Sequence, residues 1–482
     1  MKDERLEVFF NPKSIAVIGA SRNPVKVGYQ IVYNLKRSYR GKIFPVNPKA
    51  TEILGLKAYP SVKDIPEPVD LAVISIPAPR VPNAVKECGE KGVKGVIVIS
   101  GGFKEIGPEG AKLEKQVVEI ARQYNIRLLG PNVVGTYVPK TGVNTTFINP
   151  ERQGFPDHGP IAFLSQSGAF GIAVLDWAAM RGIGLSKFVS LGNKADINES
   201  DLLEYLIDDE DTRVITMYIE GVEDGRRFMD TLRRTTIEKP VIVLKSGRTE
   251  AGSRAIASHT GSLAGTDQIY TAVFKQTGTI RAYGMEELFD MATALALQPP
   301  ARGNRVAILT VGGGSGVMAA DACMDLGLKV PKLSEQTEEK LRKILLPIAS
   351  PHNPVDVTGS ARDEHLVESV EVLMRSNEID IIIWIPYFMV PAITEQLVEK
   401  FVKRVRRVNQ ELETPVPVVG AATGGTYTWK QASRAEKMGI PMYLSVERAA
   451  KAAWALYKCG EWLKKNNRFS EYIEKNRKVI GY

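Results

Sequence analysis

One histidine in a run of small residues is the side chain of this sequence best suited to covalent chemistry. His259 lies in the segment IASHTGSLAG (256–265), and the chain has only four histidines in 482 residues. A neutral imidazole can attack phosphorus as a nucleophile or act as a general base. The Gly, Ser, Ala and Thr residues around it predict a weakly packed loop that could move. From the residues alone, a catalytic histidine and a structural loop histidine both stay open.

A reactive imidazole needs a neighbour that decides which ring nitrogen carries the proton, and Glu220 is the best candidate. It follows the apolar run VITMYI and precedes a glycine, which predicts the carboxyl end of a strand. Parallel α/β sheets keep their ligand sites at that edge. A glutamate at a strand end can equally be a solvated loop residue, so the role is a hypothesis. The other three histidines are expected to be structural or solvated: His158, His352 and His365.

A second candidate site is the turn FLSQSGAFG (163–171), where a predicted strand ends and a helix begins. It does not match the hydrolase motif GxSxG, because Leu164 and Gln166 replace the first glycine and the nucleophile. Helix N-termini present unpaired N–H groups and the positive end of the helix dipole, so an anion cradle fits better. A serine that only caps the helix is the structural alternative. The candidate phosphate ligands are Ser165, Gln166, Ser167 and Gly168.

The N-terminal turn VIGASRNP (17–24) follows a strand at the place where a Rossmann fold binds its cofactor. Its spacing is not GxGxxG, because the glycine after Gly19 is Gly28. The second predicted strand ends in NPK (47–49), without the Asp or Glu that holds the ribose of NAD. Lysine suits a phosphorylated ribose, so coenzyme A and NADP are both candidates, and an empty turn is the structural alternative.

Three segments share one pattern: a β-branched apolar run, a glycine-rich turn and a helical stretch, beginning near Ser14, Gly159 and Asn304. Apolar strands that alternate with helices predict parallel sheets covered on both faces. We therefore predict an α/β chain with a Rossmann-like domain followed by two related doubly wound domains. Stretches rich in Pro, Gly and polar residues at 146–160 and 298–304 give the boundaries. The predicted domains are 1–147, 148–300 and 301–482, the last with a C-terminal helical tail.

Composition argues against several classes of protein. The net charge of +8 is spread along the chain, and its densest group, KRVRR (403–407), has the spacing of a solvated helix face, so no nucleic acid is expected. A charged N-terminus and the lack of an apolar run of about 20 residues predict no secretion signal and no membrane segment. Cys88, Cys323 and Cys459 are far apart, which argues against a disulfide framework and favours a cytoplasmic location. No spacing suggests a metal site.

The ordered set of motifs resembles the α subunit of ADP-forming (NDP-forming) acyl-CoA synthetases, within the succinyl-CoA synthetase superfamily. In chain order the motifs are VIGASRNPVKVG, IFPVNPK, VISIPA, VISGGFKEIG, LLGPN, SQSGAFG, YIEG, ASHTGSLAG and VGGGSGVMAAD. The resemblance runs from Ile15 to Gly460. It implies a Rossmann-like CoA-binding domain and two flavodoxin-like ligase domains. The implied reaction is acyl-CoA + ADP + phosphate = carboxylic acid + CoA + ATP, through an acyl phosphate and a phosphohistidine.

The resemblance also assigns roles to residues. His259 falls on the phosphorylated histidine, and Glu220 falls on the carboxylate that orients it. The Ser165–Gly168 turn falls on the helix start that holds phosphate, and the segment LGNKADI (191–197) falls on a loop that borders the acyl and phosphate pocket. The implied CoA-binding residues are Gly19, Ala20, Ser21, Arg22, Lys26, Asn47, Pro48, Lys49, Ile76, Pro77, Ser100 and Gly101.

Two features depart from the pattern of many relatives. Val133 stands where they have a cysteine, so no cysteine role is expected there. Nothing in the sequence suggests an ATP-grasp domain. The resemblance therefore implies a separate ATP-grasp β subunit that binds ADP or ATP with Mg, in an α2β2 heterotetramer.

Two other functions are the alternatives. The missing GxGxxG counts against an NADP-dependent oxidoreductase. The presence of both Glu220 and His259 counts against a non-catalytic CoA-binding regulatory protein. The sequence leaves open which carboxylic acid is used and whether the nucleotide is ADP or GDP. It also leaves open the subunit stoichiometry and the physiological direction of the reaction.

Overall fold

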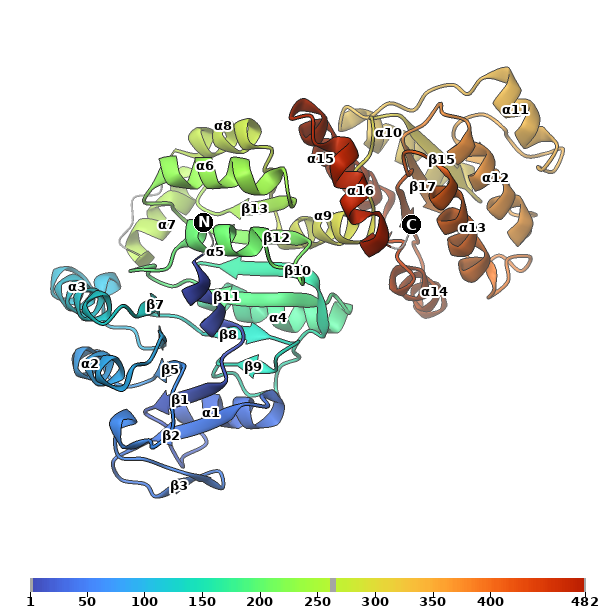
Figure 1. The fold of residues 1–482 in the computed structure, drawn as a ribbon. Helices are drawn as coiled ribbons and strands as arrows, with labels where there is room; N and C mark the ends of the chain where they lie inside the picture. The colour runs from blue at the N-terminus through green and yellow to red at the C-terminus, as the bar shows by residue number, and fades with distance from the viewer. Residues whose placement is uncertain (1–2, 261–265, 481–482) are drawn as a thin grey trace. The chain divides into compact units, whose positions relative to one another are not determined.

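The structure, a computed structural model, describes residues 3–260 and 266–480, without the side chains of residues 4, 256–260 and 478–480. The chain forms two compact units, Met1–Tyr283 and Gly284–Tyr482. Helices cover both faces of mainly parallel sheets (Figure 1). The α/β class predicted from the sequence is therefore confirmed.

The first sheet has five parallel strands in the spatial order β2, β1, β5, β6, β7. Its strands are β1 (Ser14–Ile18), β2 (Lys42–Val46), β5 (Leu71–Ile74), β6 (Gly95–Val98) and β7 (Arg127–Leu129). Its helices are α1 (Val27–Ser38), α2 (Val81–Lys91) and α3 (Pro108–Gln123). The short elements are η1 (Glu4–Phe9), β3 (Glu52–Ile53), β4 (Leu56–Lys57), η2 (Val62–Asp64), η3 (Ala78–Arg80) and η4 (Lys104–Ile106). Because β1 lies between β2 and β5, the strand order reverses there, which creates a crevice at the carboxyl ends.

The second sheet has the order β14, β13, β12, β10, β11, β8, β9, and only β8 and β9 run antiparallel to their neighbours. Its strands are β8 (Thr136–Val138), β9 (Val143–Asn144), β10 (His158–Ser165), β11 (Leu185–Ser190), β12 (Val214–Ile219), β13 (Val241–Lys245) and β14 (Ile280–Ala282). Its helices are α4 (Gly168–Arg181), α5 (Glu199–Ile207), α6 (Gly225–Thr236), α7 (Glu250–Thr260) and α8 (Asp267–Thr277).

The first two sheets share one hydrophobic core. Val17 and Val73 from the first sheet belong to the same buried cluster as Leu164 and Ile215 from the second. The alternate residues of β1, such as Ala16, enter a separate core on the other face of the first sheet. Strands β8 and β9 also precede the boundary predicted at residue 147 and pair within the second sheet. These shared contacts explain why both sheets lie in one compact unit.

The second unit contains a five-stranded parallel sheet in the order β16, β15, β17, β18, β19. Its strands are β15 (Val306–Thr310), β16 (Val355–Asp356), β17 (Ile381–Ile385), β18 (Val418–Ala421) and β19 (Met442–Tyr443). Its helices are α9 (Met285–Leu297), α10 (Gly313–Asp325), α11 (Glu335–Arg342), α12 (Asp363–Arg375), α13 (Leu397–Glu411), α14 (Thr426–Lys437), α15 (Val446–Lys465) and α16 (Phe469–Ile480). Helix α9 precedes the boundary predicted at 300 but packs against α15.

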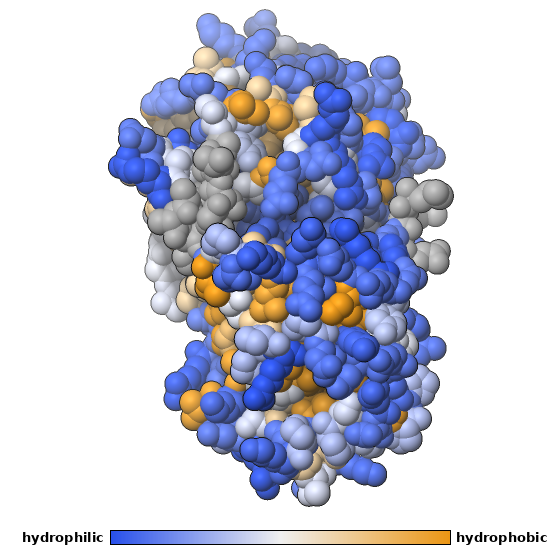
Figure 2. All heavy atoms as spheres, turned by 90° about the vertical axis from the view of Figure 1, so that its left-hand side faces the viewer, coloured by the Kyte–Doolittle hydropathy of each residue, from blue (hydrophilic) through white to orange (hydrophobic). Residues whose placement is uncertain are grey.

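Sequence patterns explain these elements locally. Every residue of β1 and of β17 is buried, as expected for β-branched strands covered on both faces. The basic segment 403–407 lies on α13 with Val405 buried and Arg407 exposed, as a helix face at the surface requires. On the face shown in Figure 2, hydrophobic side chains form small patches separated by hydrophilic ones.

Three further sequence expectations can be compared with the described residues. The three cysteines are buried and unpaired. Among residues 3–260 and 266–480, no helix is long and apolar enough to cross a membrane. Within that same part of the chain, no group of three or more His, Cys, Asp or Glu side chains could hold a metal ion.

Candidate functional site

The residues predicted to bind CoA collect at the carboxyl edge of the first sheet. They follow β1, β2, β5 and β6, which are neighbours in that sheet. The side-chain Nδ2 of Asn47 donates to the carbonyl oxygen of Ala20 at 2.7 Å, joining the ends of β2 and β1. The hydroxyl of Ser100 donates to the carbonyl oxygen of Ile76, joining the ends of β6 and β5. The structure thus brings these sequence-predicted residues together in the crevice expected of this fold.

Two glycines bring the start of α1 against the β1 turn. Gly19 has a positive φ of 94°, and a Cβ there would lie 2.8 Å from the carbonyl oxygen of Ser75. A Cβ on Gly28 would lie 2.0 Å from the carbonyl oxygen of Gly19. These are the tight-turn and close-packing roles of glycines in a nucleotide-binding turn. Gly19 and Gly28 take these roles here, although their spacing differs from that of the GxGxxG motif.

Exposed cations surround this edge. Arg22 and Lys26 lie in the turn between β1 and α1, and Lys49 lies in the turn after β2. All three side chains are exposed. Positive side chains beside a helix N-terminus favour a phosphorylated ligand.

The start of α4 forms the second candidate site. The hydroxyl of Ser167 caps this helix by accepting from the N–H of Phe170 at 3.3 Å. In the described part of the chain, the backbone N–H groups of Ser167, Gly168 and Ala169 have no acceptor. Ser165 is fully buried, and its hydroxyl donates to the carbonyl oxygen of Ser167 at 2.7 Å. The capacity to bind an anion therefore lies in three N–H groups and the Ser167 hydroxyl.

Gln166 has different partners from those expected of a phosphate ligand. Its side-chain Oε1 accepts from the N–H of Glu220 at 2.6 Å and from the N–H of Gly221 at 3.1 Å. Its Nε2 donates to the carbonyl oxygen of Gly221 at 2.9 Å. Its own backbone N–H donates to the carbonyl oxygen of Tyr218 at 3.1 Å. Both ends of the amide thus bind the turn that carries the predicted carboxylate.

Glu220 is half-buried and follows the end of β12, beside the end of β13. Lys245, the last residue of β13, is 1% exposed, and its Nζ lies 4.7 Å from the centroid of the Tyr270 ring. Burial lowers the pKa of the Lys245 ammonium, Arg281 lowers it further, and the carboxylates of Asp267 and Glu220 oppose this. Lys245 was not predicted from the sequence, although a lysine that ends an apolar strand was a visible signal.

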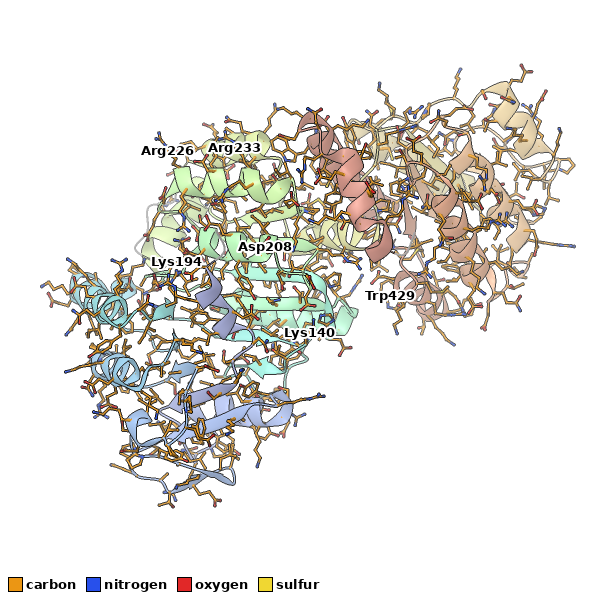
Figure 3. The ribbon with its side chains drawn as sticks, in the orientation of Figure 1. Lys140, Lys194, Asp208, Arg226, Arg233 and Trp429 are labelled. Atoms are coloured by element: carbon orange, nitrogen blue, oxygen red, sulfur yellow. The ribbon has the colours of Figure 1, made fainter. Side chains whose placement is uncertain are left out.

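Lys194, in the segment 191–197, contacts the turn of Glu220 and Gly221 after β12. It has a positive φ of 58°, and its Nζ donates to the carbonyl oxygen of Gly221 at 2.8 Å. The same Nζ lies 3.2 Å from the carboxylate of Glu199, which is buried. Figure 3 shows Lys194 beyond the end of the second sheet, where it follows β11. A pocket of about 100 Å³ at this place is lined by Lys194, Asn198, Glu199, Ser200, Glu223 and Asp224.

Asn193 connects this segment to the first sheet. Its Nδ2 donates to Glu105 at 2.6 Å and to Glu114 at 2.8 Å. Burial raises the pKa of Glu114, while the hydrogen bond from Asn193 opposes it. Burial also acts on Glu105, but hydrogen bonds from Asn193 and from the N–H of Gly102 hold its pKa below the usual value. Gly102 directly follows the predicted CoA-binding residues, so the segment 191–197 borders both candidate sites.

His259 lies in the last turn of α7, but its side chain lies outside the described residues. The stretch expected to be a loop is helical from Glu250 to Thr260, because the hydroxyl of Thr249 accepts from the N–H of Gly252 and starts a helix. From Glu250 to Ala255 the side chains are exposed or half-buried. The contact between His259 and Glu220 stays a prediction.

The other histidines are bound to surface groups rather than to either site. His158 lies 3.8 Å from Asp211, and the Nδ1 of His352 lies 2.8 Å from Glu338. The Nδ1 of His365 accepts from the N–H of Arg362 at the start of α12. These contacts agree with the structural or solvated roles expected for them.

Three family models match the chain. They describe a CoA binding domain over residues 13–139, a succinyl-CoA ligase like flavodoxin domain over 158–295, and a ligase-CoA domain over 306–460. These matches cover both candidate sites and the sheet of the second unit.

Individual proteins are similar over most of the chain. The α subunit of acetate–CoA ligase (ADP-forming) II from Pyrococcus furiosus is 45% identical, over 94% of this chain and 97% of that protein. A 4-hydroxybutyrate–CoA ligase (ADP-forming) from Nitrosopumilus maritimus is 44% identical, over 73% of this chain and 50% of that protein. The solved structure of dinucleotide-forming acetyl-coenzyme A synthetase 1 from Candidatus Korarchaeum cryptofilum, in complex with phosphate and ADP, has a TM-score of 0.88 and 38% identity. That comparison covers 96% of this chain and 98% of the other. The chain therefore belongs to the family of ADP-forming acyl-CoA synthetase α subunits, which are acid–thiol ligases.

Proposed function

We propose that this chain catalyses acyl-CoA + ADP + phosphate = carboxylic acid + CoA + ATP, with His259 as the phosphoryl carrier. The observation that carries the proposal is that one compact unit contains the carboxyl edge of the first sheet and the carboxyl edge of the second sheet. One edge holds the glycine turn and its cations, and the other holds the free N–H groups of α4 beside Glu220. An acyl thioester and a phosphate bound at these edges could react with each other.

The first step is the attack of phosphate on the acyl thioester. A phosphate oxygen forms a bond to the acyl carbon, the carbon–sulfur bond breaks, and CoA leaves as the thiol after taking up a proton. CoA supplies the thiol that carries the acyl group. The exposed Arg22, Lys26 and Lys49 suit the phosphate groups of CoA. The N–H groups at the start of α4 hold the attacking phosphate and neutralise its charge.

The second step moves the phosphoryl group to His259. The imidazole nitrogen forms a bond to phosphorus, the bond between phosphorus and the acyl oxygen breaks, and the acid leaves as its carboxylate. The Glu220 carboxylate accepts a hydrogen bond from the ring nitrogen that carries the proton, so that the other nitrogen points at phosphorus. A nucleoside diphosphate then takes the phosphoryl group from His259. The exposed and half-buried side chains of residues 250–255 support a segment that can detach from the rest of the unit.

A partner subunit completes the enzyme in this proposal. The P. furiosus relative is itself named a subunit, and this chain covers 97% of its length. We assign ADP or ATP with Mg to an ATP-grasp β subunit in an α2β2 assembly. Within this chain we assign CoA binding to 1–147, the phosphohistidine segment to 148–300 and the second ligase domain to 301–482. A cytoplasmic location stays a prediction.

The identity of the acid is a separate question. Relatives named for acetate and for 4-hydroxybutyrate are 45% and 44% identical to this chain. Overall similarity therefore does not select one acid. Assaying the reconstituted complex with a panel of acyl-CoA thioesters, with ADP and with GDP, would identify the substrates.

The direct test is phosphorylation of the histidine. The chain, purified with its β subunit and incubated with γ-labelled ATP and Mg, should acquire a label that is stable in base and labile in acid. We expect the His259→Ala variant to take up none and the His352→Ala variant to be labelled normally, because His352 lies at the surface beside Glu338. A label that persists in His259→Ala would overturn the proposal.

A further inference from the structure

Gln166 makes more polar contacts with the Glu220 turn than any phosphate-binding role would need. Its amide oxygen accepts from two successive N–H groups, those of Glu220 and Gly221. Its amide nitrogen donates to the carbonyl oxygen of Gly221. One side chain therefore binds the three backbone polar groups at the point where the chain leaves β12.

The chemistry of this contact requires an amide. A carboxylate at position 166 could accept from the two N–H groups but could not donate to the carbonyl oxygen. A lysine or arginine could donate but could not accept. The carbonyl oxygen of Gly221 has a second donor in the Nζ of Lys194, at 2.8 Å, so both of its lone pairs are used.

A buried carboxylate lies close to both donors to the Gly221 carbonyl oxygen, the Nζ of Lys194 and the Nε2 of Gln166. Glu199 is 2% exposed, and its carboxylate lies 3.2 Å from the Nζ of Lys194. The same carboxylate lies 3.5 Å from the Nε2 of Gln166, at the outer limit of a hydrogen bond. This carboxylate determines which end of the Gln166 amide faces it, because only the NH2 group can donate.

We propose that Gln166 is a positioning residue, which fixes the Glu220–Gly221 turn relative to the phosphate-binding start of α4. The proposal rests on the proposed function, because it gives Gln166 an effect only through Glu220. Gln166 lies directly between Ser165 and Ser167. A single amide therefore fixes the carboxylate that orients the histidine relative to the N–H groups that hold phosphate. Errors of about 1 Å in such an arrangement can slow a reaction by about 100-fold.

The test is a double-mutant cycle between Gln166 and Glu220 in the complex with the β subunit. Gln166→Met keeps the length of the side chain and removes both hydrogen-bonding groups. We expect it to slow phosphohistidine formation from acyl-CoA and phosphate by about 10- to 100-fold, while the KM for phosphate and the affinity for CoA are unchanged. Glu220→Gln should slow the same step, and the double variant should be no slower than Glu220→Gln alone.

The controls separate positioning from a loss of folding. Gln153→Met removes another buried glutamine of the same unit and should leave the rate unchanged. Thermal unfolding of each variant shows whether the unit stays folded. If Gln166→Met does not fold, Gln166→Glu keeps the two acceptor contacts, loses the donor to Gly221 and places a second carboxylate beside Glu199. It should be slower than the wild type and no slower than Glu220→Gln.

Each other outcome has a defined meaning. A raised KM for phosphate in Gln166→Met would make Gln166 a phosphate ligand and overturn the inference. If the double variant were slowed by the product of the two single effects on the rate of phosphohistidine formation, the inference would also be overturned. A normal rate in Glu220→Gln would overturn both the inference and the proposed role of Glu220, whereas loss of the label in His259→Ala would still support the phosphohistidine.

Discussion

At the scale of single residues, the site contains a lysine whose burial carries an energetic cost. Lys245 is 1% exposed and has the Tyr270 ring against its ammonium group. Among the described residues, no carboxylate lies within ion-pair distance of it. Taking an ammonium ion out of water without a close counter-charge costs several kcal/mol in free energy. Such costs are typically retained at functional sites, where a charge is needed.

The free energy of unfolding should depend on pH because of this cost. Burial lowers the pKa of Lys245 below the value in the unfolded chain. Between these two values the unfolded chain binds more protons, so Lys245 contributes stability that rises with pH. We therefore expect the free energy of unfolding of the wild type, minus that of Lys245→Met, to increase from about pH 7 to about pH 10. Denaturant titrations at the two pH values measure it. A difference that decreases with pH would contradict the assignment.

At the scale of elements, the start of α4 has two tasks that one substitution can separate. The Ser167 hydroxyl caps the helix, and it also lies beside the three free N–H groups. Loss of an N-cap costs about 1 kcal/mol in free energy of unfolding. We expect Ser167→Ala to show this loss and to raise the KM for phosphate.

A matched control exists in the second unit. Ser445 caps α15 by accepting from the N–H of Arg448 at 3.4 Å. Ser445→Ala should lower stability by a similar amount and leave the KM for phosphate unchanged. If both variants changed the KM equally, the effect of Ser167 would be one of stability alone.

The contact between α1 and the β1 turn gives a second prediction at this scale. A Cβ on Gly28 would lie 2.0 Å from the backbone oxygen of Gly19, so Gly28→Ala must push the helix away from the turn. We expect the affinity for CoA to fall by at least about 10-fold and the free energy of unfolding to fall by about 1–3 kcal/mol. Calorimetric titration with CoA measures the first. Gly225→Ala is the control, because nothing lies within 4 Å of a Cβ there, and it should bind CoA normally.

At the scale of the whole first unit, Asn193 joins the segment after β11 of the second sheet to η4 and α3, which belong to the first sheet's part of the unit. It donates to Glu105 and Glu114, and Glu114 is buried within α3. We expect Asn193→Leu to lower the free energy of unfolding by about 1–3 kcal/mol, because a buried carboxyl loses a donor.

The pH at which this loss is measured should matter. Burial raises the pKa of Glu114 and Asn193 opposes this, so removing Asn193 raises the pKa further. Removing the hydrogen bond raises the free energy of the ionised Glu114 carboxylate more than that of the protonated carboxyl. The destabilisation should therefore be larger at neutral pH than at acidic pH, where the carboxyl is protonated in both proteins. Thermal unfolding at both pH values tests this, and an equal loss would show that the ionised form is not involved.

Much of this molecule could be predicted from the sequence because its signals are local. The apolar strands, the glycine turns and the motifs at strand ends predict parallel sheets, and such sheets place those ends along one edge. This is why the residues predicted to bind CoA do lie together. The helix from Glu250 to Thr260 was not predicted, because small residues occur in loops and in helices alike.

The sequence by itself thus determined the class of fold, the family and the segments that form the two candidate sites. The tertiary structure decided how the polar groups within them are used. Gln166 lies in the turn predicted to bind phosphate, and its amide binds the turn after β12, a strand that is adjacent in space and distant in sequence. Lys245, Asn193 and the shared core of the two sheets became evident for the same reason. Hydrogen-bond partners and burial depend on which segments become neighbours in the folded chain, and local sequence patterns do not contain that information.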